Sequence, residues 1–557
     1  MAEHTPDLAN TGTDTGTETG TDTGTDVLGP LVACAPVEGA AGTLRATDPA
    51  TGEEFGAPVG LVDSRQIQEA TRAAEEALDA FRGQSPAERA AFLRRVADNI
   101  EALGDALVDR AVRESGLPRQ RLAGERARTT GQLRMFADVV AQGDALGARI
   151  DPALPDRAPQ PRADLRLAHI PIGPVVVFGA SNFPLAFSTA GGDTAAALAA
   201  GCPVVVKGHN AHPGTAALVG RAVADAVRES GLPGGVFSLL FGEGNGIGQE
   251  LVADPRVKAV AFTGSRGGGL ALMRVAAERP EPIPVFAEMS SVNPVFVLPG
   301  ALAGQGAQDL AGAYVASLTL GAGQFCTNPG LVFVPSTPDG DRFVEAAARL
   351  VADATGQTML TAPIARAFRD GVEALEARPE VALRARGGEG EGPNAPAPAL
   401  AEVSLADITA DPRLSEEVFG AAGTVVRYPD AAALPAALEG LEGQLTATLH
   451  ADTGDPVDLA AARALLPVLE RRAGRVLFGG WPTGVEVTHA MVHGGPFPAT
   501  SDARGTSVGS LALHRFLRPV SYQDMPDALL PPPLRRDNPW RLNRRVEGTV
   551  VPGGDHA

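Results

Sequence analysis

Cysteine is scarce in this sequence, and its scarcity excludes one class of protein. Three cysteines among 557 residues cannot form the framework of a disulfide-rich secreted protein, so we expect a reducing compartment and a cytoplasmic location. Basic residues are also few, because 47 Lys and Arg stand against 66 Asp and Glu, which gives a formal net charge of −19. Since phosphate backbones are bound by basic surfaces, this balance argues against nucleic acid as a partner.

Long apolar runs are absent as well. No stretch of about 18 apolar residues is available to cross a membrane. The N-terminus, MAEHTPDLAN, has no basic region followed by an apolar one, so we expect no secretory signal. Residues 11–26, TGTDTGTETGTDTGTD, lack large side chains to bury, and we expect a disordered acidic tail over residues 1–30.

Glycine and proline, in contrast, are abundant, with 66 and 46 residues. They indicate many short connections, and a chain of this length exceeds what one hydrophobic core serves. Helical patterns dominate from residue 64. Residues 64–83 begin at Ser64, a possible N-cap, and the Ser85-x-x-Glu88 spacing fits a capping box. Residues 124–144 predict a further helix.

Short apolar segments rich in β-branched residues then alternate with helical stretches. The predicted strands are 174–178, 203–207, 236–241 and 258–263. This alternation predicts a parallel sheet covered by helices on both faces, with ligands at the carboxyl ends of its strands. The pattern continues into a second α/β domain, in which residues 384–400 predict a surface loop.

Polar residues follow two of these strands. Asn182, in GASNFPLAF, is placed either to donate to a developing oxyanion or to cap a helix beginning near Phe183. Lys207 ends the next strand and is either a solvated charge or a contact to a nucleotide. Its loop also holds His209 and Asn210, without a carboxylate, and this composition suits a ribose 2′-phosphate, hence NADP rather than NAD.

Two glycine-containing joints follow later strands. Gly242 and Gly246 belong to FGEGNGIGQEL, where glycines permit close approach to a pyrophosphate, although the strict spacing of a dinucleotide fingerprint is absent. Gly264 and Ser265, in FTGSRGGG, could cap a helix and face the phosphates.

Cys326 lies in GAGQFCTNPG, a polar break between a helical segment and a strand. Such a cysteine is either a filler or a nucleophile held on a loop. Glu288, at the end of an apolar strand, is either paired structurally or poised as a base with a raised pKa, and Glu417 occupies a similar setting. The spacing of the nine histidines predicts no metal site. Cys202 is expected to be a buried filler.

These segments together resemble the aldehyde dehydrogenase superfamily over roughly residues 45–520. The stretches that carry the resemblance are GASNFPLAF, GCPVVVKGHNAHPG, VAFTGS, FAEMSSVNP, GAGQFCTNPG and EEVFG. PTGVEVTHAMVHGGPFPATSDARGTSVG is similar to the group of NADP-dependent α-ketoglutaric semialdehyde (2,5-dioxovalerate) dehydrogenases and fatty aldehyde dehydrogenases. Two departures from the wider family, Met-Ser-Ser-Val after Glu288 and HGGPFPAT near the C-terminus, are shared with this group.

The resemblance implies roles for the matching residues. Cys326 would be the nucleophile, Asn182 an oxyanion donor and Glu288 the base that activates water. For cofactor binding the resemblance implies Lys207, Gly264, Ser265, Glu417 and Phe419. The composition of the polar loop and of the glycine segment adds His209, Asn210, Gly242 and Gly246 to the residues expected at the cofactor. The candidate residues for substrate binding are Phe183, Arg128 and Phe497.

The implied fold is α/β, with a Rossmann-type cofactor domain, a second α/β catalytic domain and a small oligomerisation element. The expected boundaries are 31–150 and 166–286 for the cofactor domain, 287–500 for the catalytic domain, and 151–165 and 501–545 for wrapping segments. The family also implies a homodimer or homotetramer that binds no membrane.

The implied reaction is NADP-dependent oxidation of an aldehyde to an acid, with 2,5-dioxopentanoate as the expected substrate. An anionic substrate needs a cationic partner, for which the predicted helix offers Arg126, Arg128 and Arg134. Three alternatives stay open at this point: a long-chain fatty aldehyde dehydrogenase, a catalytically idle NADP-binding assembly protein, and a coenzyme-A-acylating dehydrogenase. Glu288 at the water-activating position disfavours the last.

Overall fold

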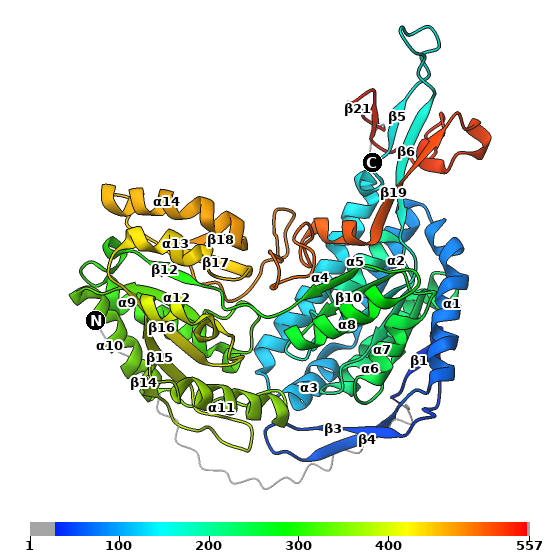
Figure 1. Ribbon diagram of the computed structural model, residues 1–557. Coiled ribbons are helices and arrows are strands. Elements are labelled where there is room, and N and C mark those ends of the chain that lie inside the picture. The colour runs from blue at the N-terminus through cyan, green and yellow to red at the C-terminus, as the bar shows by residue number, and fades with distance from the viewer. Residues whose placement is uncertain (1–27, 554–557) are drawn as a thin grey trace, which may run out of the picture.

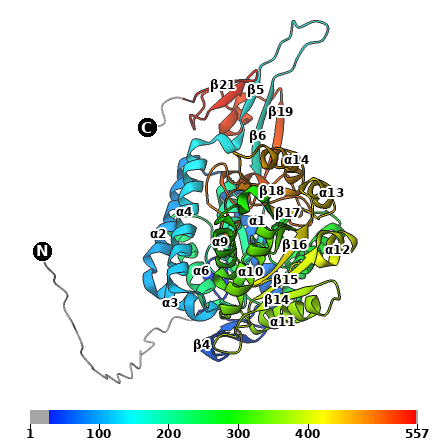
Figure 2. The same ribbon diagram turned by 90° about the vertical axis from the view of Figure 1, so that its left-hand side faces the viewer.

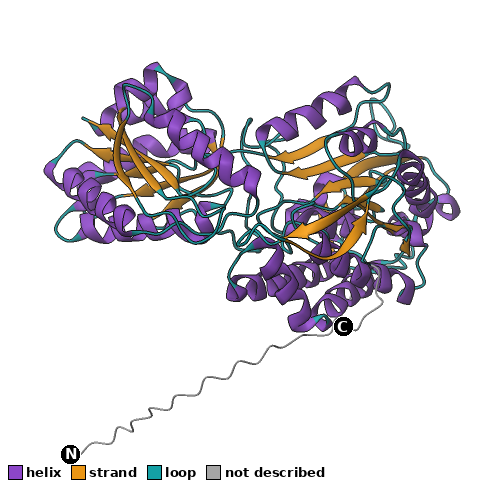
Figure 3. Cartoon of the chain, turned by 90° about the horizontal axis from the view of Figure 1, so that it is seen from below, coloured by secondary structure: helices purple, strands orange, loops and turns teal. Residues whose placement is uncertain are grey.

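The protein has two lobes with a projecting arm, as a computed structural model shows for residues 28–553 (Figure 1). The tail expected at residues 1–30 lies almost entirely outside this described part. Viewed from below, each lobe is a layer of strands between layers of helices (Figure 3). The predicted α/β class is therefore confirmed, and each lobe is an α/β unit.

The first lobe is built on a seven-stranded sheet of order β11-β10-β7-β8-β9-β1-β2, in which β11 to β9 are parallel. The strands are β1 (Leu31–Val32), β2 (Ala35–Pro36), β7 (Val175–Phe178), β8 (Val204–Lys207), β9 (Phe237–Leu240), β10 (Ala259–Thr263) and β11 (Val285–Glu288). The helices between them are α5 (Gly192–Ala200), α6 (Pro213–Glu229), α7 (Gly246–Ala253) and α8 (Arg266–Glu278). The four strands predicted from the sequence are all present.

Alternation along the strands explains how this sheet is buried on both faces. Val175 and Val177 pack with α5 and α6, whereas Val176 packs with α7 and α8 on the opposite face. Successive side chains of a strand point to opposite faces, so a run of valines supplies two cores at once.

Four helices precede the sheet in the chain: α1 (Ser64–Arg82), α2 (Pro86–Ala102), α3 (Gly104–Ser115) and α4 (Arg119–Gln142). The N-cap of α1 is Asp63 rather than the expected Ser64, because the Asp63 carboxylate accepts the Gln66 N–H and the Gln66 side chain accepts the Asp63 N–H. The capping box predicted at Ser85 is confirmed. Helix α4 begins five residues before the predicted segment and thereby includes Arg121. Within residues 28–553, no helix combines the length and apolarity needed to span a membrane.

The second lobe contains a sheet of order β14-β15-β16-β13-β12-β17-β18. Its strands are β12 (Val295–Val297), β13 (Leu331–Pro335), β14 (Ala382–Arg386), β15 (Ala399–Ser404), β16 (Ala422–Tyr428), β17 (Gln444–His450) and β18 (Ala473–Phe478). Its helices are α9 (Gly306–Thr319), α10 (Pro338–Asp353), α11 (Ala362–Glu376), α12 (Leu405–Ala410), α13 (Leu434–Glu439) and α14 (Pro456–Arg472). The surface loop predicted at 384–400 is partly wrong, because its ends belong to β14 and β15, which pair antiparallel.

The arm is a five-stranded sheet of order β19-β6-β5-β20-β21 that extends beyond the first lobe (Figures 1 and 2). Its strands are β5 (Arg149–Asp151), β6 (Leu165–Pro171), β19 (Leu517–Gln523), β20 (Arg544–Val546) and β21 (Thr549–Val551). The arm thus extends beyond the expected segment 151–165 on both sides and beyond residue 545, but its strand β19 begins only at Leu517, later than the expected start at 501. A separate hairpin joins β3 (Thr43–Thr47) and β4 (Glu54–Gly60).

The segment 493–507 connects the two lobes. Ala499 accepts a backbone hydrogen bond from Met289, and Thr500 forms a bridge with Glu288 at the end of β11. The chain therefore returns to the first lobe within the range expected for the catalytic domain, and it brings His493 with it.

Candidate active site

A cleft of about 1330 Å³ is lined by residues of both lobes. Among the residues predicted from the sequence, those that line it are Asn182, Lys207, His209, Gly264, Ser265, Glu288, Cys326, Glu417 and Phe419. The lining does not include Phe183, Arg128, Asn210, Gly242, Gly246 or Phe497. The carboxyl ends of the first-lobe strands contribute Lys207 and Glu288, as the topology predicts.

Cys326 is held at the junction between α9 and β13. The preceding backbone is left-handed at Gly321, Ala322 and Gly323 (φ 57°, 59° and 70°), which turns the chain sharply into the cleft. A Cβ on Gly323 would lie 2.3 Å from the Gly420 backbone, so this position also requires glycine. Cys326 is only partly buried and borders the cleft. Burial and the neighbouring charge of Glu288 raise its pKa well above the usual value, so the sulfur needs a base.

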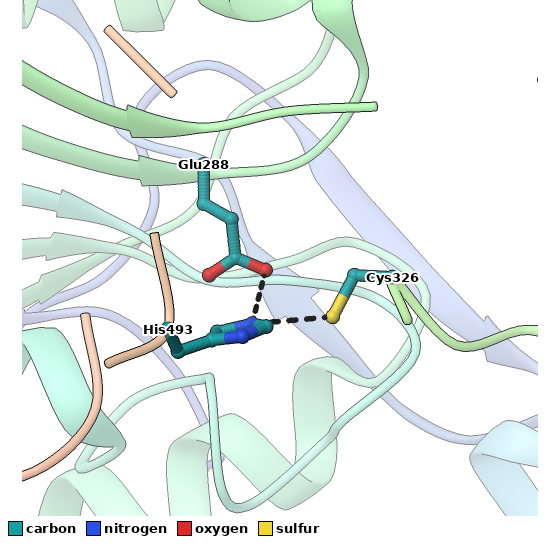
Figure 4. A group of neighbouring side chains, drawn as sticks. All are labelled: Glu288, Cys326 and His493. Carbon is teal, nitrogen blue, oxygen red and sulfur yellow. Dashed lines mark hydrogen bonds and ion pairs between the residues drawn. The ribbon is translucent and has the colours of Figure 1, made fainter. Parts of the chain in front are cut away.

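Glu288 is 4 % exposed and lies beside this thiol (Figure 4). Its Oε1 is 2.7 Å from His493 Nε2, and its Oε2 accepts a 2.8 Å hydrogen bond from Ser507 Oγ. Burial alone would raise the pKa of this carboxyl, but His493 and Ser507 outweigh burial and lower it. Of the two expectations for Glu288, a raised pKa is therefore not what the structure shows.

His493 was not predicted from the sequence, although it is the first residue of the HGGPFPAT run that departs from the wider family. Its side chain is 1 % exposed, and its Nε2 lies 3.4 Å from Cys326 Sγ as well as 2.7 Å from Glu288. Its buried Nδ1 has no hydrogen-bond partner. His493 Nε2 is therefore the ring atom that donates to Glu288, while Nδ1 makes no hydrogen bond.

These three side chains also form a potential metal-binding group. A ligand atom from each of Glu288, Cys326 and His493 lies within 4.8 Å of the others. Thiolate, imidazole and carboxylate are ligands that zinc uses. Spacing along the chain predicted no metal site, because these residues meet only in the folded protein.

Asn182 lies in a turn and does not cap a helix, since α5 begins only at Gly192. Its Nδ2 donates a 3.1 Å hydrogen bond to the backbone carbonyl of Gln324, two residues before Cys326. The side-chain amide therefore lies next to the loop that carries the thiol. This geometry supports the prediction that Asn182 donates to an oxyanion rather than the prediction that it caps a helix.

The other end of the cleft is lined by basic and small residues. Lys207 Nζ lies 3.0 Å from Asn210 Oδ1, and burial lowers its pKa to about 8. No carboxylate pairs with Lys207 among the described residues. Burial, with the charges of His212 and Lys207, lowers the pKa of His209 well below its usual value. In the glycine segment, the cleft is lined by Gly244, Asn245 and Gly248 instead of the predicted Gly242 and Gly246.

Gly264 and Ser265 also line this end, and Ser265 caps α8 by accepting the Gly268 N–H at 3.2 Å. Glu417 and Phe419 border the cleft from the second lobe. Burial raises the pKa of Glu417 to about 8, opposed only by the backbone N–H of Ser291. A cradle of this size, with a helix N-terminus and an unpaired lysine, fits an anionic dinucleotide.

The residues expected at the substrate are dispersed. Phe183 lies against Phe325, the neighbour of Cys326, with ring centroids 5.5 Å apart. Phe497 is 54 % exposed and lies away from the cleft lining. Arg128 donates to the Val485 carbonyl at 2.5 Å, and its ring contact is Phe187.

Arg126 donates to the Gly104 carbonyl, and Arg134 pairs with Asp98 at 2.8 Å. Of these three arginines, Arg128 lies nearest to the thiol chamber, the group formed by Cys326, Glu288 and His493. The link is Phe187, because its ring contacts both Arg128 and His493. Cys202 is fully buried, and burial raises its pKa to about 11, as expected for a filler.

Comparison with known proteins decides the family. The sequence pattern described as the aldehyde dehydrogenase family matches residues 37–494. The chain belongs to the aldehyde dehydrogenase family. It is 56 % identical over 519 residues to "Alpha-ketoglutaric semialdehyde dehydrogenase 2" of Azospirillum brasilense, covering 93 % of this chain and 98 % of that protein. It is 48 % identical over 506 residues to "Alpha-ketoglutaric semialdehyde dehydrogenase" of Acinetobacter baylyi, covering 89 % of this chain and 94 % of that one.

Solved structures of aldehyde dehydrogenase type share the fold. A 3,6-anhydro-L-galactose dehydrogenase in complex with NADP superposes with a TM-score of 0.74 at 22 % identity, over 89 % of this chain and 99 % of that one. A 1-pyrroline-5-carboxylate dehydrogenase gives 0.74 at 20 % identity, over 89 % and 92 %. As a member of the family, this aldehyde dehydrogenase is an oxidoreductase that uses a nicotinamide cofactor and a cysteine thiol.

Proposed function

We propose that this aldehyde dehydrogenase oxidises a short oxo-acid semialdehyde, 2,5-dioxopentanoate, to 2-oxoglutarate with NADP. The observation that carries the substrate is the 56 % identity to an α-ketoglutaric semialdehyde dehydrogenase over nearly the whole chain. The proximity of Cys326, Glu288 and His493 supports the reaction. The buried, unpartnered Nη2 of Arg128 supports an anionic substrate.

The first step is attack by Cys326 Sγ on the aldehyde carbon. The thiol proton goes to Glu288, whose lowered pKa keeps it ionised and ready to accept. The carbonyl oxygen becomes an oxyanion that Asn182 Nδ2 and the Cys326 backbone N–H stabilise, and the product is a thiohemiacetal. A nicotinamide cofactor held beside Lys207, Gly264 and Ser265 would supply the two-electron acceptor needed to convert this adduct into a thioester.

The second step is hydrolysis of the thioester. After the thiol proton has passed from Glu288 to solvent, Glu288 removes a proton from water and the water oxygen bonds to the acyl carbon. The carbon–sulfur bond then breaks, Glu288 returns the proton to the sulfur, and the acid and the free thiol are released. Ser507 and His493 fix the two carboxylate oxygens of Glu288 in place. A carboxylate that is hydrogen-bonded through both oxygens loses little orientation entropy before it acts.

Arg128 is suited to the distal carboxylate of the substrate. Its Nη2 is buried without a partner, and no Asp or Glu of the described chain lies within ion-pair distance. A carboxylate from the substrate would satisfy this donor by a charge-assisted hydrogen bond.

A panel of aldehydes with wild-type enzyme and Arg128→Met tests the substrate. We expect kcat/KM to be highest for 2,5-dioxopentanoate and to fall about 10²-fold in the variant, through KM, as for a lost hydrogen-bonded charge pair. Butanal, which lacks the carboxylate, serves as the control and should be oxidised equally by both. A preference of the wild type for long alkanals would instead assign a fatty aldehyde dehydrogenase, and no reduced cofactor from any aldehyde would assign an idle protein.

The preference for NADP rests on Lys207, His209 and Asn210, because an unpaired ammonium in a loop without carboxylates suits a 2′-phosphate. Lys207→Met should raise the KM for NADP more than the KM for NAD. Equal effects on the two cofactors would contradict the preference.

We also infer a homo-oligomer, dimer or tetramer. Edge strand β18 exposes Val476 and Phe478, at 37 % and 58 %, and apolar side chains on an open sheet edge favour a further partner. Sedimentation velocity of the purified enzyme checks this.

A further inference from the structure

One buried guanidinium contacts both loops that carry the catalytic groups. Arg121, in the first turn of α4, has a side chain that is 15 % exposed. Its guanidinium carbon is 4.9 Å from the ring centroid of Phe183 and 4.5 Å from that of Phe325. Phe183 follows Asn182 and Phe325 precedes Cys326, so one cation is packed against the neighbours of both the oxyanion donor and the nucleophile.

Hydrogen bonds make the contact to the oxyanion loop directional. Arg121 Nη2 donates to the Asn182 carbonyl at 2.7 Å. Its Nε lies 3.3 Å from Glu125 Oε1, one turn along α4, while Glu125 Oε2 accepts the N–H groups of Leu185 and Ala186 at 3.3 and 3.5 Å. Arg121 thus binds the turn at Asn182, and Glu125 binds it three to four residues later.

The contact to the nucleophile loop is close packing. A Cβ on Gly321 would lie 2.5 Å from Arg121 Nη1, so the left-handed turn that leads to Cys326 runs directly against the guanidinium. Any displacement of Arg121 would therefore free both loops, which belong to different lobes.

We propose that Arg121, held by Glu125, is a positioning residue that sets the distance between the oxyanion donor Asn182 and the nucleophile Cys326. The guanidinium is already engaged by the protein, because its Nε pairs with Glu125 and its Nη2 donates to the Asn182 carbonyl, and only Nη1 has no hydrogen bond. Arg128, two turns along the same helix, has no such partner, and the two arginines have separate tasks: Arg128 attracts the substrate, and Arg121 aligns the groups that react with it.

The test compares Arg121→Ala and Arg121→Lys with Arg134→Ala, a control on the same helix whose exposed partners are Asp98 and Glu101. Each enzyme is assayed with 2,5-dioxopentanoate and with butanal, and rates are divided by the number of thiols that iodoacetamide titrates. Misplacement of a catalytic group by about 1 Å costs about 10²-fold, so we expect kcat of Arg121→Ala to fall by about that factor on both aldehydes.

Three further readouts separate positioning from a structural role. The KM for NADP should not change, added guanidinium ion should restore part of the kcat of Arg121→Ala, and Arg121→Lys should lose less than Arg121→Ala because it keeps a donor. Loss of titratable thiol with unchanged kcat per thiol would make Arg121 merely structural and overturn the proposal. A loss restricted to the anionic aldehyde would make it a substrate ligand, and this also overturns the proposal.

Butanal keeps this test independent of the proposed substrate. If the wild type does not oxidise 2,5-dioxopentanoate, the proposed substrate fails, whereas the butanal rates still decide the role of Arg121. If Arg121→Ala does not fold, Arg121→Lys decides instead: a wild-type kcat per thiol in that variant, on both aldehydes, would overturn the proposal.

Discussion

Each lobe contributes a carboxyl group to the cleft, and the pKa values of these two groups are displaced in opposite directions. Glu288, at the thiol end, is the more deeply buried, yet its pKa is lowered. Glu417, which borders the cleft from the second lobe, is only partly buried, yet its pKa is raised to about 8. Partners rather than depth decide the protonation state, because Glu288 has an imidazole and a hydroxyl and Glu417 has one backbone N–H.

This difference matches the tasks expected of the two carboxyl groups. A base that deprotonates a thiol and water must be ionised at the working pH. A group that borders an anionic cofactor gains nothing from a negative charge, and a neutral carboxyl can still donate and accept hydrogen bonds. Four predictions test whether the reaction at Cys326 and the binding of the cofactor depend on different residues.

Removal of the nucleophile should abolish catalysis and leave the affinity for the cofactor unchanged. Cys326→Ala deletes the atom that forms the covalent adduct, so kcat should fall by more than about 10⁴-fold. Isothermal titration should give the same Kd for NADP in the variant and the wild type, since the sulfur lies at the far end from Lys207. A large change in that Kd would show that the two ends are not independent.

Replacement of the base Glu288 should stop the reaction after the thioester on Cys326 has formed. Glu288→Gln keeps the shape but cannot accept a proton, so we expect steady-state kcat to fall about 10²–10⁴-fold, as for a lost general base. Because burial and the charge of Glu288 raise the pKa of Cys326, removal of that charge favours the thiolate, so attack should be less impaired than hydrolysis. Intact-protein mass spectrometry after mixing with aldehyde and NADP should therefore detect the acyl adduct on Cys326. Glu417→Gln is the matched control and should accumulate no adduct.

Loss of His493 should change the pH dependence of activity. His493 lowers the pKa of Glu288, so in His493→Ala that pKa rises and the base becomes protonated at a higher pH. The acidic limb of the kcat–pH profile should therefore move to higher pH, and activity on that limb should fall roughly tenfold for each pH unit by which the limb moves. His493→Gln, which keeps an N–H donor, should move the limb less. Superimposable profiles would contradict this role.

His493 also shows where the sequence stops being sufficient. Periodicity and turn residues predict the parallel strands and the cleft at their carboxyl ends. Family resemblance predicts that Cys326, Glu288 and Asn182 lie in this cleft. His493 is 167 positions from Cys326 and 205 from Glu288, in a segment rich in glycine and proline that has no periodicity of its own. Arg121 was missed for a related reason, since the predicted helix began too late, and the contacts of its side chain depend on how α4 packs between the lobes.

The smallest effect is expected at Glu417, in the stability of the enzyme. Its folded pKa of about 8 lies above the usual value of 4.5, so the folded protein holds a proton that the unfolded chain releases as the pH rises. Stability is then unaffected at acid pH, declines between about pH 4.5 and 8, and is lowest above that range. Glu417→Gln cannot ionise, so its Tm should match the wild type near pH 5 and exceed it by a few degrees near pH 9. Glu288→Gln is the opposite case, because removal of a carboxylate stabilised by His493 and Ser507 should lower Tm near neutral pH. Equal Tm differences for both variants at both pH values would mean that burial alone governs the two carboxyl groups.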